Sequence, residues 1–195
     1  MSTVNINAVL QKVMDSPKVG AAMEQRARQI FEKTKGEVIE QFRESNITKE
    51  INIGQDAPNI SATLGGYGNL FSYIGFYAEE NPLLPVEKYL TNFKFRSKVP
   101  KKRSRSGTIS LSFQINWFDM NIIDSLTPMP WEPGNSWVRG IERGISGFSY
   151  YMFGNFVGSR SGKAKQSKHK VGLAPTFNPQ RYLPSIIKEA AAKFK

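Results

Sequence analysis

Cysteine is absent from this sequence of 195 residues, and histidine occurs only once, as His169. Without cysteine the chain has no disulfide, no thiolate ligand for a metal ion and no cysteine nucleophile. One histidine is too few for a multi-histidine metal site. Because His169 stands among lysines in an expected loop, its side chain is more typical of a solvated group than of a triad base. We therefore expect no catalytic, cofactor-binding or metal-binding residues.

Long hydrophobic runs are missing as well. No apolar stretch approaches the roughly 18–20 residues that a membrane-spanning helix needs, so we expect no membrane contact. The first residues lack a basic segment followed by an apolar one, which predicts that no signal peptide is present. Hydrophobic residues nevertheless make up 39% of the chain and aromatic residues 12%. That is enough for a folded core, and the length predicts a single domain over residues 1–195.

Acidic residues are missing from two stretches of the otherwise mixed sequence. The net charge is +11, but residues 1–90 carry nine Lys and Arg against eleven Asp and Glu. Residues 91–195 carry eighteen against five, and twelve of those eighteen cations lie in the acid-free stretches 92–117 and 159–170. Such blocks repel themselves, which favours an anionic partner, although solvated loops have the same composition. The candidate partner-binding residues are Lys94, Arg96, Lys98, Lys101, Lys102, Arg103, Arg105, Arg160, Lys163, Lys165 and Lys168.

Helical patterns occur near both ends of the sequence. Ser16 and Pro17 form a typical N-cap and first helical position, and apolar residues then recur with helical period, which predicts a helix over about 17–45. A second helix is expected over about 180–194, after Asn178 and Pro179. A shorter one, capped by Asn135, should carry Trp137, Val138, Ile141 and Ile145 on one face, and residues 86–90 could form one helical turn.

Strand patterns dominate the middle of the sequence, about 68–176. Apolar and polar residues alternate without error over 108–117 and, less regularly, over 93–99, which predicts an antiparallel hairpin with a basic turn at 100–107. That turn is longer than a tight hairpin needs, which favours a projecting binding element. Residues 70–77 and 148–156 are aromatic runs typical of buried strands, and the second leads into a basic loop at 159–170.

These patterns predict an α+β fold. We expect a mostly antiparallel β-sheet or small sandwich with a long projecting hairpin, packed against the long N-terminal helix and a short C-terminal helix. In the hairpin, Phe93, Phe95 and the apolar residues of 108–117 share one face and the cations lie on the other. That arrangement is typical of a core face, whereas a base-stacking surface puts aromatics and cations together.

Two catalytic patterns are incomplete. The segment from Gly158 to Lys163 is similar to a phosphate-binding loop, but its first spacing is one residue short and Ala164 stands where a hydroxyl residue is required. The carboxylates at Asp119, Asp124, Glu132 and Glu142 could build a metal-dependent nuclease site beside the basic hairpin. Their spacing does not favour that site over ordinary surface carboxylates.

The order of these elements resembles the tail-completion and head–tail connector (neck) proteins of tailed bacteriophages. A long N-terminal helix leads to the segment Gly68-Asn69-Leu70, a sheet with a long hairpin follows, and Arg181-Tyr182-Leu183-Pro184 precedes a short C-terminal helix. The stretches 131–134, 144–147 and 159–162 also look like those of phage tail and neck proteins. The resemblance covers most of the chain as a pattern of short motifs.

The resemblance implies a non-enzymatic virion component, assembled in the host cytoplasm. Such a protein forms a ring, with a hexamer favoured, between the connector or portal side and the tail tube or tail terminator, where it can contact packaged DNA incidentally. The two halves of the chain, with net charges of −2 and +13, suit head-to-tail contacts between subunits. The alternative is a nucleic-acid-binding module that uses the two basic loops as a phosphate clamp.

Overall fold

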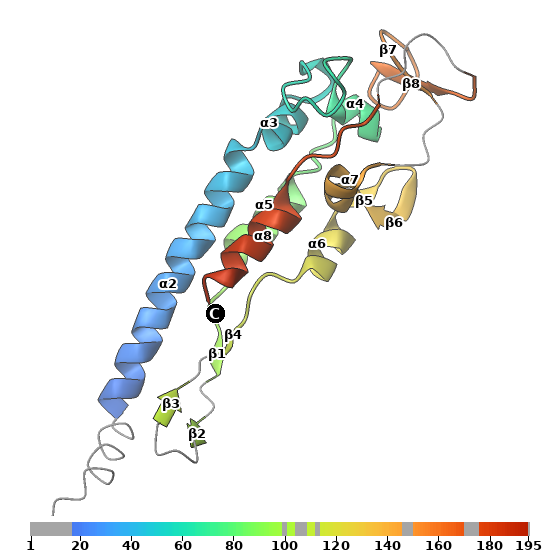
Figure 1. The fold of residues 1–195 in the computed structure, drawn as a ribbon. Coiled ribbons are helices and arrows are strands. Elements are labelled where there is room, and N and C mark those ends of the chain that lie inside the picture. Colours follow the sequence, from blue (N-terminus) through green and yellow to red (C-terminus); the bar gives the residue numbers. More distant parts are fainter. Residues whose placement is uncertain are drawn as a thin grey trace, which may run out of the picture.

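The computed structural model describes residues 17–98, 101–103, 109–111, 114–145, 150–169 and 176–194. The molecule is elongated, with helix α2 (Pro17–Glu44) along one side and small strand pairs at both ends (Figure 1). Helix α8 (Leu183–Ala192) lies beside α2, and an ion pair between Lys193 Nζ and Glu37 Oε2, 2.5 Å apart, joins the two helices.

Helices account for most of the regular structure. Between α2 and α8 the chain forms α3 (Asn46–Ile53), the 3₁₀ helix η1 (Gly54–Asp56), α4 (Leu70–Ile74), α5 (Leu84–Asn92), α6 (Met120–Leu126) and α7 (Trp137–Arg143). Side-chain caps define several of these starts, including Ser45 for α3, Asp119 for α6 and Ser136 for α7.

The strands form antiparallel pairs. They are β1 (Ser97–Lys98) with β4 (Gln114–Ile115), β2 (Lys101–Arg103) with β3 (Ile109–Leu111), β5 (Pro128–Met129) with β6 (Glu132–Ser136), and β7 (Tyr150–Phe153) with β8 (Ala164–Ser167). The α+β class is thus confirmed. Within the described ranges, however, the pairs do not join into a larger sheet, and no sandwich is present.

Four local predictions are wrong, for reasons of capping and pairing. Residues 101–103, expected in the basic turn 100–107, form strand β2 because they pair with residues 109–111. Residues 70–74 form helix α4, not a strand, because Asn69 accepts a hydrogen bond from Ser72 N at the start and Gly75, with φ of +86°, ends the helix. Ser136, and not Asn135, caps α7. The basic segment after Gly158 is a loop only in its first part, because residues 164–167 pair with β7 as β8.

Helix α2 forms as its sequence pattern predicts. The residues that it buries are Ala27, Phe31, Thr34, Val38 and Phe42. They recur every three or four positions, so they lie on one face of the helix, which packs on the rest of the molecule. Gly36 is on the exposed side, and a Cβ added there meets nothing within 4 Å.

Gly36→Ala is expected to raise the free energy of unfolding by about 1 kcal/mol, because alanine restricts the unfolded chain and favours the helix. Urea unfolding followed by far-UV circular dichroism measures the change. Gln25→Ala, also exposed on α2, is the control and should change stability by only a few tenths of a kcal/mol. A loss of stability in Gly36→Ala would mean that this face of α2 is covered.

Aromatic side chains dominate the core where α2, α5 and α8 meet. The rings of Phe31 and Trp117 meet edge to face with centroids 5.5 Å apart, and Trp117 Nε1 donates to the Ile187 carbonyl at 3.2 Å. Further along the molecule, the hydroxyls of Thr48 and Tyr182 lie 2.9 Å apart and join α3 to the start of α8. Residues close to both ends of the chain therefore build one core.

Helix α8 begins within the segment Arg181-Tyr182-Leu183-Pro184. Glu142 of α7 reaches over, and its Oε1 accepts hydrogen bonds from Tyr182 N at 2.8 Å and Ser185 N at 2.9 Å. A carboxylate at a helix N-terminus accepts hydrogen bonds from free backbone N–H groups and interacts favourably with the positive end of the helix dipole. Pro184 lies in the first turn, where its missing N–H costs nothing.

Candidate functional site

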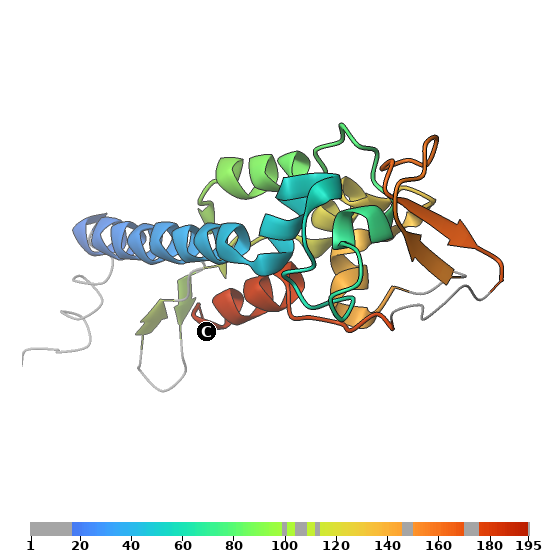
Figure 2. The same ribbon diagram turned by 90° about the horizontal axis from the view of Figure 1, so that it is seen from above.

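The two basic stretches lie at opposite ends of the molecule. Strands β1 to β4 stand near the N-terminal end of α2, and β7 with β8 stands at the other end, as Figures 1 and 2 both show. The structure therefore does not bring the two predicted loops together. One nucleic-acid strand would have to run along the whole molecule to touch both of them.

The first end is the segment 97–115, here called the hairpin end together with Lys94 and Arg96. Ser97 pairs with Ile115 and Arg103 pairs with Ile109, so both strand pairs follow one register. Lys94 and Arg96 are exposed. Lys98, Lys101, Lys102 and Arg103 are placed by their backbone in β1 and β2, and Arg105 lies outside the described residues.

The aromatic residues at the base of the hairpin end face the core, as the sequence predicts. The rings of Phe93 and Phe95 lie 6.1 and 5.4 Å from the ring of Phe31. Arg28 of α2 also lies over the Phe95 ring, with its guanidinium carbon 5.0 Å from the ring centre. These aromatic faces are occupied by α2, so they do not form a surface on which bases could stack.

The second end, here called the β7–β8 end, carries the other predicted cations. Lys163 is tied internally, with Nζ 3.2 Å from Asp56 Oδ1 and 3.0 Å from Asn155 Oδ1. Arg160, Lys165 and Lys168 are exposed and form no ion pair with any described residue. Of the four predicted residues at this end, three are therefore available to a partner and one fixes the loop.

A buried carboxylate that sequence reasoning missed holds the scaffold of the β7–β8 end. Glu50 is fully buried and accepts hydrogen bonds from Leu70 N at 2.6 Å, Ser61 N at 2.8 Å and Asn59 Nδ2 at 2.8 Å. Asn59 Oδ1 in turn accepts from Leu64 N at 3.0 Å. The carboxylate thus accepts hydrogen bonds from backbone N–H groups of this loop, which in a helix or a sheet would bond to backbone carbonyls.

The loop that Glu50 organises positions β7 through one tyrosine. Tyr151 Oη donates to the Asn69 carbonyl at 3.2 Å. Gly68 leaves space for the Tyr151 hydroxyl, because a Cβ on Gly68 would lie only 2.6 Å from Tyr151 Oη. Burial raises the pKa of the Tyr151 phenol well above its ordinary value, so the donor stays protonated. The segment Gly68-Asn69-Leu70 therefore acts as the attachment point of the β7–β8 end.

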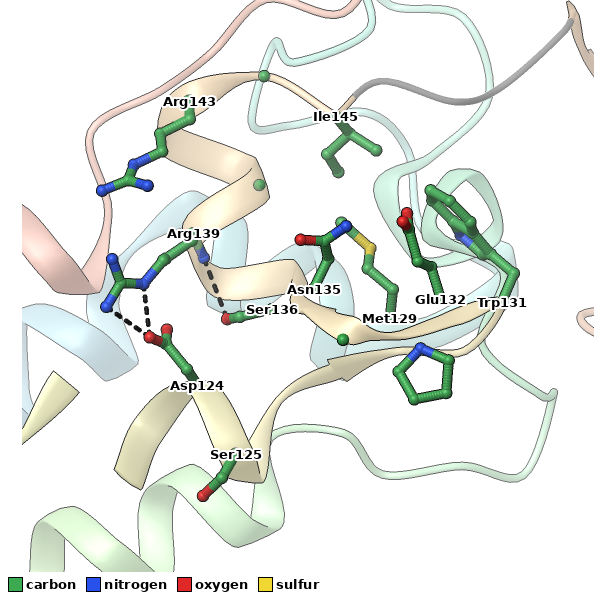
Figure 3. Close-up of a pocket in the computed structure, with 14 residues that line it drawn as sticks. Asp124, Ser125, Met129, Trp131, Glu132, Asn135, Ser136, Arg139, Arg143 and Ile145 are labelled. Carbon is green, nitrogen blue, oxygen red and sulfur yellow. Dashed lines mark hydrogen bonds and ion pairs between the residues drawn. The ribbon is translucent and has the colours of Figure 1, made fainter. Parts of the chain in front are cut away.

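One hollow of about 410 Å³, here called the α7 hollow, lies between α7 and the β5–β6 pair (Figure 3). Its floor is polar. Asp124 Oδ2 contacts Arg139 Nε and Nη2, both at 2.5 Å, and this hydrogen bond raises the pKa of Arg139 above its ordinary value. Glu132 and Arg143 stand apart from that pair in Figure 3. Of the four charged side chains that line the hollow, Asp124 and Arg139 are therefore paired with each other.

Three of the four carboxylates considered for a nuclease site are used locally. Asp119 caps α6, Asp124 pairs with Arg139, Glu142 caps α8 and Glu132 is exposed. In the described ranges, no three or more His, Cys, Asp or Glu side chains are grouped so that they could hold a metal ion. Over the same ranges, none of the helices combines the length and the apolar stretch needed to cross a membrane.

A second hollow, of about 660 Å³, opens between α4 and the turn that joins β7 to β8. We call it the Arg160 groove; it is lined by Ser72, Gly75, Trp131, Phe156, Val157 and Arg160, among others. Trp131 lines both hollows, and its Nε1 donates to the Ile74 carbonyl at 3.1 Å. The sequence signal for this groove was present in the glycines and serines of 158–162, but their partners on α4 could not be foreseen.

The chemistry that both ends offer is anion binding. Exposed guanidinium and ammonium groups stand at each end, and charge-assisted hydrogen bonds from such groups to carboxylates or phosphates are the strong ones. Comparison of the chain with protein-family models, with curated proteins and with solved structures finds no match.

Proposed function

We propose that the protein is a non-enzymatic structural component of a tailed-phage virion, forming a ring at the neck or tail top in tail completion or head–tail joining. The observation that carries the proposal is the position of the basic surfaces at opposite ends of an elongated body. A subunit that joins two assemblies needs one docking surface for each of them.

The order of elements supports the same role. The long helix α2, the segment Gly68-Asn69-Leu70, the antiparallel pairs β1–β4 and β2–β3 and the proline-opened α8 follow one another in the order that resembles neck and tail-completion proteins. The partners in this proposal are the connector or portal on one side and the tail tube or tail terminator on the other. The ring is a homo-oligomer, with a hexamer favoured, and its place is the virion.

The proposal predicts rings. Mass photometry and negative-stain microscopy at high protein concentration, with the chain alone and with purified tail tubes or connectors, should show ring particles or decorated tube ends. A protein that stays monomeric and binds neither assembly would contradict the proposal. Because some ring proteins assemble only on a partner, the mixtures decide the outcome.

Charge variants at the two ends sharpen the test. Lys94→Ala with Arg96→Ala should block attachment at the hairpin end, and Arg160→Ala with Lys165→Ala should block it at the β7–β8 end. Lys88→Ala with Lys188→Ala removes two other exposed cations and is the matched control. Equal effects of all three pairs would show that total charge, not position, determines assembly.

The acid-free stretches keep nucleic-acid binding as the second candidate. The same variants distinguish DNA binding from ring assembly. If the cations contact phosphates, a plot of the logarithm of DNA affinity against the logarithm of salt concentration should fall with a slope of several units. Loss of DNA binding with intact assembly, or the reverse, assigns each end to one partner. No DNA binding at about 50 mM salt would remove the phosphate clamp.

A further inference from the structure

The walls of the Arg160 groove come from two elements that the sequence separates widely. Ser72 of α4 and Gly75, the residue that ends this helix, form one wall. The turn between β7 and β8 forms the other wall with Phe156 and Arg160. Arg160 Nη1 lies 3.1 Å from the position that a Cβ on Gly75 would take, so the guanidinium lies directly over that glycine.

Two hydroxyls at this groove have no hydrogen-bond partner among the described residues. The Oγ atoms of Ser72 and Ser159 are both buried and unpaired, and Ser72 as a whole is only 4% exposed. Buried polar atoms in folded proteins are almost always paired. Ser72, Ser159 and Arg160 line the same groove, and their hydroxyls and guanidinium are donor groups of the kind that bind the oxygens of an anion.

The turn that carries Arg160 is held in place. The Arg160 carbonyl accepts from Ala78 N at 3.1 Å, and Phe156 N donates to the Gly162 carbonyl at 2.9 Å. Val157, at the tip of this turn, is completely exposed. A hydrogen-bonded turn that leaves a valine fully in water, next to Phe156 and Trp131, presents an apolar surface beside the anion donors.

We infer that the Arg160 groove binds an acidic peptide segment of a partner protein. A carboxylate of the segment lies against Arg160 and the hydroxyls of Ser72 and Ser159, and an apolar residue next to it packs on Phe156, Val157 and Trp131. Lys165 at the rim adds charge. This inference rests on the proposal that the β7–β8 end is a protein-docking surface.

The contacts favour a peptide over a nucleic-acid backbone. Lys163, the residue that a phosphate-binding loop would use, is occupied by Asp56 and Asn155. A phosphate backbone also has no apolar group to place on Val157, whereas an acidic segment with an apolar neighbour satisfies both parts of the groove.

Fluorescence anisotropy of the full chain tests the inference. The probe is a fluorescein-labelled peptide of alternating glutamate and leucine, with its glutamine counterpart and a single-stranded oligothymidine of similar length as comparisons. The glutamate peptide should bind most tightly. Arg160→Ala should weaken it by at least about tenfold and Ser72→Ala by about three- to tenfold, the effect of losing a charged and an uncharged donor.

Lys188→Ala removes an exposed cation of α8 remote from the groove and should leave peptide affinity unchanged. Circular dichroism of each variant shows that its fold is retained. Absence of peptide binding, equal binding of the glutamine peptide, or insensitivity to both Arg160→Ala and Ser72→Ala overturns the inference. Tighter binding of the oligothymidine, lost in Arg160→Ala, overturns it in favour of a phosphate ligand.

The same measurements keep the two proposals apart. Peptide binding through Arg160 by a chain that forms no ring and binds no tail component supports the groove and contradicts the neck role. Ring assembly by a chain that ignores the peptide contradicts the groove inference and leaves the neck role standing.

Discussion

Replacing Glu50 by alanine is expected to lower the free energy of unfolding by about 3 kcal/mol or more. The carboxylate accepts three hydrogen bonds, from Leu70 N, Ser61 N and Asn59 Nδ2, and all of it is buried. Removing the acceptor leaves these donors unpaired inside the protein, at roughly 1–3 kcal/mol for each one that stays unpaired. Urea unfolding followed by far-UV circular dichroism measures the loss.

Two further variants show whether hydrogen bonding is the cause. Glu50→Gln keeps the shape and one acceptor oxygen, so its loss should be smaller than that of Glu50→Ala. Glu40→Ala removes an exposed glutamate of α2 and should change stability by no more than about 0.5 kcal/mol. If Glu50→Ala behaves like Glu40→Ala, the loop from Asn59 to Leu70 does not depend on the carboxylate.

Replacing Gly68 by alanine is expected to destabilise the protein by about 2–5 kcal/mol. The backbone at Gly68 has φ of +69°, which costs an alanine about 1–2 kcal/mol. The added Cβ would also lie 2.6 Å from Oη and 2.8 Å from Cε1 of Tyr151, and relieving such an overlap costs another 1–3 kcal/mol or so. The free energy of unfolding in urea is again the measurement.

Gly65→Ala separates the two causes. Gly65 has φ of +59°, but a Cβ there meets nothing within 4 Å, so only the backbone cost of about 1–2 kcal/mol should appear. The cost of Gly68→Ala should also shrink in a Tyr151→Phe background, because the nearest atom is gone. Equal losses for Gly65→Ala and Gly68→Ala would mean that Tyr151 moves aside freely.

The parts of the fold that could be predicted from sequence are those with a long, regular pattern. Helix α2 repeats its apolar residues at helical spacing along its length, so its structure follows from local spacing. The alternation over 93–99 and 108–117 predicts antiparallel pairing, which β1 with β4 and β2 with β3 show only over short stretches. The prediction of a strand at α4 is wrong because this helix is only five residues long. Its aromatic composition favours a strand, and the caps at Asn69 and Gly75 decide otherwise.

Some features of the candidate sites could likewise be predicted from the sequence, and others could not. The cations were visible in the sequence, because acid-free stretches need no knowledge of the fold. Three features depend on contacts between residues far apart in sequence. The cations are separated to opposite ends of the molecule, Lys163 forms an ion pair with Asp56, and the turn that carries Arg160 lines one groove together with α4. Glu50 could have been noticed only from its place beside Ile47 and Ile51 on the apolar face of α3.

Helix α2 runs along one side of the elongated body, with the hairpin end near its N-terminal end. Its 28 residues extend over about 42 Å, and α8 stiffens it from one side. Under the proposed role, the protein is therefore a spacer of set length. Two weak attachments on one rigid body reinforce each other only when the opposing sites match that length, because a mismatch lowers the effective concentration of the second contact. Avidity, rather than the strength of either end, then selects correctly spaced partners.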